Sequence, residues 1–251
     1  MTRQQTTTTP EATRAPLPER RTAVKRLGRA SGVMAEMLKV VTLPWTWLAA
    51  AATWAVALGV AFATRQAYPD HPIAQLAPQV ALFTVSAGCA ALGAVVGAHE
   101  FAGQWRTTLL TTPARARACA RRWAVRLVGS GVVGLVTSAA VLLGLGARSG
   151  RAGEFSLLLS MAAFFTLVTV FGWLIAEVTR SMTPAAVIVL LALWLPPVLK
   201  TAAPEVVKWL PGEVAAPLLT ASGMSTTQAA ALAAWLAAAI VMAAWAQRRD
   251  A

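Results

Sequence analysis

Charged side chains are scarce in this chain of 251 residues, where Asp, Glu, Lys and Arg together make up only 13%. In a soluble domain about a quarter of all residues are charged, so the composition argues against a soluble globular protein. Hydrophobic residues make up 57%, and the mean hydropathy is +0.60. The composition therefore predicts a membrane protein.

Cysteine and histidine are equally rare, with two of each. Cys89 lies inside an apolar run and Cys119 in a basic segment, so we do not expect them to pair. The sequence contains no C-x-x-C motif and no His/Cys cluster, and it therefore predicts neither a disulfide framework nor a metal site.

Groups for catalysis inside a membrane are also lacking. His71 and His99 fall at the edges of apolar runs, none of the ten acids lies in the middle of a run, and Glu177 stands at the inner end of the fourth. This arrangement argues against an intramembrane enzyme and against a carrier coupled to protons or sodium. No G-x-x-x-x-G-K-[ST] motif occurs, so we expect no ATP hydrolysis and no cofactor in this chain alone.

Positive charge, in contrast, is in excess, with a net charge of +12. In a soluble protein this excess would suggest a nucleic-acid partner. Here the Lys and Arg residues stand in blocks between apolar runs, which is the pattern set by membrane topology. We therefore predict no nucleic-acid binding.

Six apolar stretches approach the length of about 20 residues that a helix needs to cross a bilayer. They predict six transmembrane helices, at residues 44–63, 77–98, 123–147, 155–176, 184–199 and 226–246. The fold class expected is therefore an all-α membrane protein, with its six-helix transmembrane domain over residues 40–251.

The distribution of Lys and Arg predicts the orientation of these helices. The leader, the second connection counted to Arg126, the fourth connection and the tail carry 17 of the 22, whereas the other three connections share 5. Because positive residues favour the cytoplasmic side, we expect both termini in the cytoplasm. The sequence thus predicts a multi-pass protein of the cell membrane.

Two segments outside the spans have their own patterns. Residues 1–18 lack an apolar period and are predicted to be disordered. Over residues 19–39, Val24, Leu27 and Met34 recur at helical spacing among basic residues, which favours an amphipathic helix on the inner membrane surface over a solvated basic tail.

Residues 200–225 form a third unusual segment, interrupted by three prolines yet largely apolar. A purely solvated loop would not need so many apolar residues. The pattern predicts short apolar helices between the fifth and sixth spans, which either dip into the membrane or cap these two spans.

The segment 99–122, which we call the elbow, carries the most specific pattern. It begins with Glu100 and Gly103, continues through an apolar patch that includes Leu109 and Leu110, and turns basic after Pro113. A plain positive loop would explain the arginines but neither the Glu-Gly pair nor the patch. The pattern therefore favours a short helix along the inner surface.

These elbow residues resemble those of the ABC-2 type permease family, the membrane subunits of ATP-driven exporters. The matching positions are Glu100, Gly103, 107–110, Pro113 and Arg115, while Gln104 stands where Thr is usual. Two other stretches are similar to actinobacterial-looking members. One is Glu36 with Lys39, before the first span, and the other is the terminal tripeptide Arg248-Arg249-Asp250.

The resemblance implies that the elbow is a coupling helix that binds a separate ATPase subunit. The residues expected at this contact are Glu100, Gly103, Gln104, Trp105, Arg106, Leu109, Leu110, Pro113 and Arg115. The ATPase subunit would bind ATP and Mg, and a second permease subunit, identical or not, would complete the transporter. The second and fifth helices of the family line the cargo path, which here nominates Phe83, Thr84, Leu190 and Trp194.

The expected function is therefore that of an exporter permease. The apolar spans point to a hydrophobic or amphipathic cargo, such as a drug, antibiotic, lipid or peptide. The alternative is a membrane scaffold or sensor subunit that transports nothing and binds a cytosolic partner through the same elbow.

Overall fold

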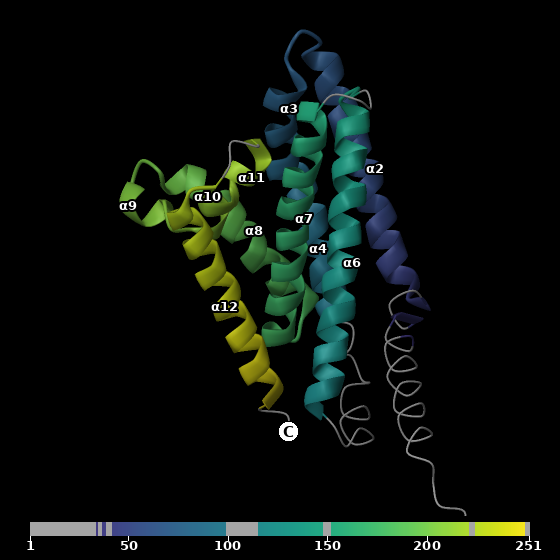
Figure 1. Ribbon diagram of the computed structural model, residues 1–251, viewed down its shortest axis with the longest axis vertical. Coiled ribbons are helices and arrows are strands. Elements are labelled where there is room, and N and C mark those ends of the chain that lie inside the picture. The colour runs from purple at the N-terminus through teal and green to yellow at the C-terminus, as the bar shows by residue number, and fades with distance from the viewer. Residues whose placement is uncertain are drawn as a thin grey trace, which may run out of the picture.

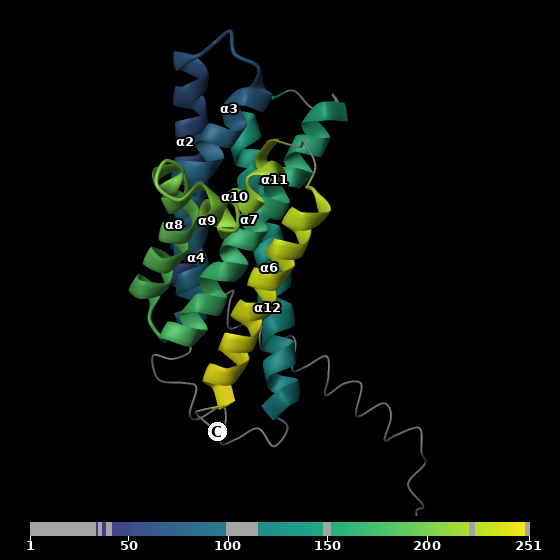
Figure 2. The ribbon, with the colours of Figure 1, turned by 90° about the vertical axis from the view of Figure 1, so that its left-hand side faces the viewer.

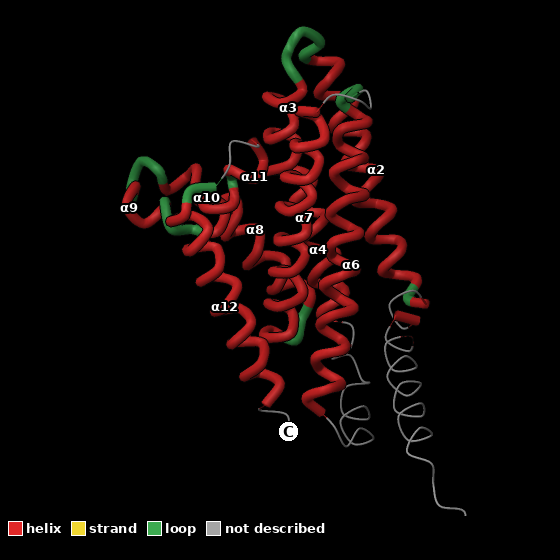
Figure 3. The backbone as a smooth tube through the Cα atoms, in the orientation of Figure 1, coloured by secondary structure: helices red, strands yellow, loops and turns green. Residues whose placement is uncertain are grey.

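The computed structural model describes residues 34, 37–38, 42–98, 115–147, 152–220 and 224–248, and their regular secondary structure is entirely helical (Figure 3). The long elements are α2 (Pro44–Ala67), α4 (Ser86–Ala98), α6 (Arg115–Gly144), α7 (Ala152–Thr179), α8 (Met182–Leu199) and α12 (Thr226–Arg248). The short ones are α3 (Ile73–Val80), the π-helical η1 (Ala81–Val85), α9 (Pro204–Val207), α10 (Pro211–Ala215) and α11 (Pro217–Thr220).

Among the described residues, five helices are long and apolar enough to cross a membrane: α2, α6, α7, α8 and α12. The all-helical membrane fold expected from the sequence is therefore confirmed at this level. The stretch predicted as the second span is not one long α-helix. It consists of α3, η1 and α4 in immediate succession, and α4 by itself has 13 residues.

Proline and a change of helix type divide this second stretch. Pro78 lies inside α3, where it has no N–H to donate to the preceding turn. The π-helical turn Ala81–Val85 follows at once, and such a turn accommodates an inserted residue without ending the helix. The hydropathy of the sequence could reveal the apolar length of this stretch but not its division.

Two other boundaries differ from, or extend, the sequence predictions. The third predicted span began at residue 123, whereas α6 begins at Arg115, so the last part of the predicted elbow is helix α6. The predicted short helices between residues 200 and 225 are present as α9, α10 and α11. Both α9 and α10 begin with a proline, a residue suited to the first helical position.

Helix α7 occupies the centre of the bundle (Figures 1 and 2). It packs against α4, α6, α8, α11 and α12, and its Met161, Phe164 and Phe165 are fully buried in the main apolar cluster. The other long helices leave much of their apolar surface outside, where a bilayer would cover it. The most buried helix thus organises the others around itself.

Glycine brings α4 and α7 into backbone contact. A Cβ atom added at Gly93 would lie 2.2 Å from the carbonyl oxygen of Thr169, and one added at Gly172 would lie 2.7 Å from that of Ala90. A Cβ atom added at Gly97, one turn beyond Gly93, would likewise lie too close to the backbone of Trp173. Gly93 and Gly97 form a G-x-x-x-G pattern, which permits close helix packing in membranes where apolar driving force is absent.

The direction of the helices brings distant parts of the chain to one end of the bundle (Figures 1 and 2). The start of α2, the end of α4, the start of α6, the α7–α8 turn and the end of α12 all lie there. The elbow residues 99–114 fall outside the described part of the chain. The helix before them, α4, ends at this side of the bundle, and the helix after them, α6, begins there.

We predict that Gly93→Val destabilises the protein by about 2 kcal/mol or more, because its side chain would force the α4 and α7 backbones apart. Gly131→Val on α6 is the matched control, since a Cβ atom there meets nothing within 4 Å. Thermal unfolding in detergent should therefore show a lower midpoint for the first variant only. Equal midpoints would mean that the α4–α7 contact does not limit stability.

Candidate functional site: a buried ion-pair network

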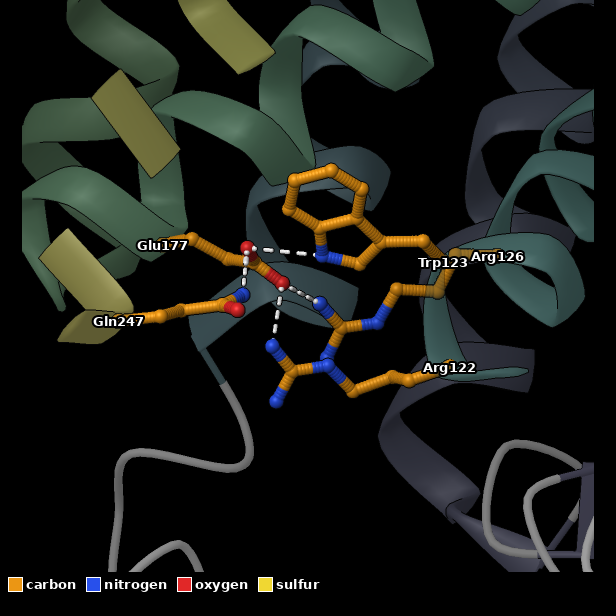
Figure 4. A network of polar contacts seen from close by, with 5 residues as sticks. All are labelled: Arg122, Trp123, Arg126, Glu177 and Gln247. Atoms are coloured by element: carbon orange, nitrogen blue, oxygen red, sulfur yellow. Dashed lines mark hydrogen bonds and ion pairs between the residues drawn. The ribbon is translucent and has the colours of Figure 1, made fainter. Parts of the chain in front are cut away.

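A carboxylate lies completely buried at the elbow end of the bundle. Glu177, near the end of α7, has no exposed surface, and two guanidinium groups of α6 reach it (Figure 4). Arg122 and Arg126 are one helical turn apart, so both side chains lie on the same face of α6. They are 4% and 5% exposed, which makes this an ion-pair network inside the protein.

Four donors surround the two carboxylate oxygens (Figure 4). Oε1 forms ion pairs with Arg122 Nη2 at 3.1 Å and with Arg126 Nη1. Oε2 accepts hydrogen bonds from Trp123 Nε1 at 3.2 Å and from Gln247 Nε2 at 2.7 Å. Because a buried charge is tolerated only when it is paired and hydrogen-bonded, these four contacts allow Glu177 to lie at this depth.

An aromatic wall encloses the network. The Trp173 ring lies 5.9 Å from the Arg126 guanidinium carbon, and the rings of Trp123 and Trp173 are 6.0 Å apart and tilted by 55°. An aromatic face favours a nearby cation electrostatically. Trp173 therefore helps to hold the Arg126 side chain while excluding water from the ion pairs.

The network connects three helices far apart in the sequence. Arg122, Trp123 and Arg126 come from α6, Glu177 from α7 and Gln247 from the last turn of α12. Any movement of the first turns of α6 must either move α7 and α12 with it or break contacts to a buried charge. The arrangement is thus suited to transmitting motion between helices rather than to covalent chemistry.

The structure describes only part of the predicted contact with an ATPase subunit. The positions Glu100, Gly103, Gln104, Trp105, Arg106, Leu109, Leu110 and Pro113 lie outside the described residues. Arg115 is the first residue of α6, at the same end of the bundle as the network. Of the predicted interfacial helix, only Met34 falls among the described site residues, and it is helical and exposed, while Val24, Leu27, Glu36 and Lys39 lie outside.

The two stretches that carry the residues nominated for the cargo path are in contact at one point. Trp194 of α8 donates its Nε1–H to the carbonyl oxygen of Leu82 at 3.2 Å, and Ser86 Oγ donates to the same oxygen. Thr84 is exposed in η1, and Leu190 is half-buried against the main apolar cluster. For Phe83 the structure describes only the backbone. The second stretch and α8 are therefore adjacent at the π-helical turn.

A small apolar cavity of about 90 Å³ lies on the other side of α8, between α7 and α12. Val189 and Leu193 of α8 line it, whereas Trp194 is turned towards Leu82. Within the described part of the chain, no three His, Cys, Asp or Glu side chains lie close enough together to hold a metal ion.

The sequence contained part of the signal for the network. Glu177 stands at the inner end of an apolar run, but no pattern in the sequence pairs it with a partner. The predicted boundaries place Arg122 at the end of the elbow and Trp123 at the start of the next span. The i, i+4 spacing of the two arginines, together with a glutamine at the end of the last span, was the pattern that could have suggested a shared partner.

No protein-family model matches this chain, and no curated protein matches it significantly.

We predict that Glu177→Gln costs about 3–5 kcal/mol, because it leaves two buried guanidinium groups beside a neutral amide. Gln247→Ala removes one hydrogen bond to a charged group and should cost less, about 1.5–3 kcal/mol. Thermal or denaturant unfolding in detergent measures both.

A double-variant cycle tests whether the charge itself matters. Adding Arg126→Gln to Glu177→Gln removes one of the uncompensated charges, so the pair of substitutions should cost less than their summed single effects. Strict additivity would show that Glu177 and Arg126 are not energetically coupled.

Proposed function

We propose that this chain is the permease subunit of an ATP-driven exporter, which moves a hydrophobic or amphipathic cargo out of the cytoplasm. A separate ATPase subunit would bind the elbow from the cytoplasm, and a second permease subunit would complete the path. The observation that carries the proposal is the network around Glu177, because it lies where a pull on the elbow would enter the bundle.

The mechanical argument follows the two helices that flank the elbow. On one side, α4 is held against α7 through Gly93 and Gly97. On the other side, α6 is held to α7 and α12 through the contacts of Glu177. A displacement of the elbow therefore acts on α7 from both sides. Such close packing favours movement as rigid bodies between discrete states over continuous deformation.

The distribution of charge supports the orientation. At the elbow end of the bundle lie Arg115, Arg117, Arg121, Arg122, Arg126, Arg180 and Arg248, whereas the opposite end carries only Arg65, Lys200 and Lys208 among the described residues. By the positive-inside rule, the elbow end faces the cytoplasm. We also propose that residues 73–98 form the sixth crossing, since 26 helical residues extend about 39 Å.

The contact between Trp194 and Leu82 suggests where the cargo path could open. A π-helical turn gives the second stretch a point of local adjustment, and Trp194 holds it to α8 by one hydrogen bond. We propose that Phe83, Thr84, Leu190 and Trp194 border the path, and that α8 and the second stretch separate there when the ATPase subunits change state.

The alternative function is a scaffold or sensor subunit that binds a cytosolic partner through the elbow without transport. The same network would then only fix the elbow end of α6 for that partner. The two functions differ in the nature of the partner and in whether ATP drives a flux.

Purification from native membranes in a mild detergent should recover an ATPase subunit with this chain, and the complex in proteoliposomes should show ATP-dependent export. Glu100→Gln combined with Gly103→Val should reduce flux about tenfold or more while insertion is retained, because the coupling contact is lost. Gly131→Val serves as the control with normal flux, since its position is open.

A partner without nucleotide-binding motifs, together with no ATP-dependent flux, would contradict the exporter function and favour the scaffold.

A further inference from the structure

A second cavity lies beside the network, on the α2 side of α6. Its volume is about 290 Å³, and four helices line it: α2, α4, α6 and α7. Its wall is almost entirely apolar and includes Trp47, Trp54 and Trp173. Along α6 it extends from Val125 to Val133, which corresponds to about 12 Å along the helix axis.

Exposed apolar side chains of α2 and α6 surround this cavity. They are Trp45, Leu48, Leu127, Val128, Val132 and Leu135. In a membrane-spanning bundle such a surface faces acyl chains wherever no other subunit covers it. The cavity is elongated along the helices, as acyl chains are, and so has the shape to admit one.

Charge identifies which lipid fits. Arg126 lies at one end of the cavity, and the part of α6 that precedes it carries four more Arg and no acid. The start of α2, with Thr46 and Trp47, lies at the same end of the cavity. Trp173 also lines the cavity, and its indole N–H has no hydrogen-bond partner among the described residues. Basic residues at the membrane surface attract anionic headgroups.

We propose that this cavity binds one acyl chain of an anionic glycerophospholipid from the leaflet on the Arg126 side, with the headgroup at the basic end of α6. The bound chain would pack against Trp173, which in turn holds Arg126 of the network. Lipid occupancy would therefore stabilise the ion pairs of Glu177. This inference does not depend on the proposed transport.

Two glycines of α6 provide a matched pair of variants. Gly129 lines the cavity, Gly131 does not, and a Cβ atom at either position meets nothing within 4 Å. Gly129→Leu thus places a side chain where the acyl chain would lie, and Gly131→Leu makes the same change on the same helix outside the cavity. The Cβ atom of either new side chain therefore lies in open space.

The experiment uses a phosphatidylglycerol with a photoactivatable acyl chain, in vesicles containing the full chain. Mass spectrometry should find adducts on peptides of α2 and α6 that line the cavity. Gly129→Leu should reduce these adducts about tenfold, because it displaces several buried methylenes, while Gly131→Leu leaves them unchanged. The same acyl chain on phosphatidylcholine should label about fivefold less.

Equal labelling of the two glycine variants would overturn the proposal, because it would indicate only general contact with surrounding lipid. Equal labelling by the two headgroups would also overturn it. Competition on the unaltered chain is independent of the folding of any variant: excess unlabelled phosphatidylglycerol should suppress the adducts, and excess phosphatidylcholine should not. Equal suppression would contradict the proposal.

Discussion

The burial of one carboxylate constrains the rest of this structure. Glu177 has no contact with solvent, so each of its oxygens must be satisfied by protein donors, and these donors come from two other helices. The requirement fixes the rotation of α6, because Arg122 and Arg126 must both face α7. It also fixes the position of the last turn of α12. A purely apolar contact would leave these helices free to slide, whereas directional contacts to a charge do not.

Close backbone packing complements this polar constraint. Hydrophobic burial cannot distinguish one helix neighbour from lipid inside a membrane, so close approach and hydrogen bonds decide which helices associate. Gly93, Gly97 and Gly172 allow α4 to approach α7 closely. At the other side of α4, a tryptophan of α8 binds a carbonyl in the π-helical turn. The helices next to the elbow are thus attached to the bundle by specific contacts, whereas much of α2, α8 and α12 faces outward.

The fold class could be predicted from the sequence because hydropathy depends on composition and length alone. Five of the predicted spans appear as long helices, and the short helices after residue 200 were indicated by proline between apolar residues. The division of residues 73–98 could not be predicted in the same way. A window of apolar residues has the same hydropathy whether its backbone hydrogen bonds join residues four or five apart. The hydrogen bond from Trp194 of α8 to the π turn joins residues 112 positions apart, and hydropathy does not report it.

The amino-acid sequence alone determined the membrane character, the approximate limits of the helices and the positive excess near the elbow. All of these depend only on which residues follow one another along the chain. The tertiary structure decided which polar residues meet. Glu177 and Gln247 are 70 residues apart, and no local pattern relates them. Only the packing of α6, α7 and α12 brings their side chains to one point, because the partner of a buried charge is chosen by distance in space.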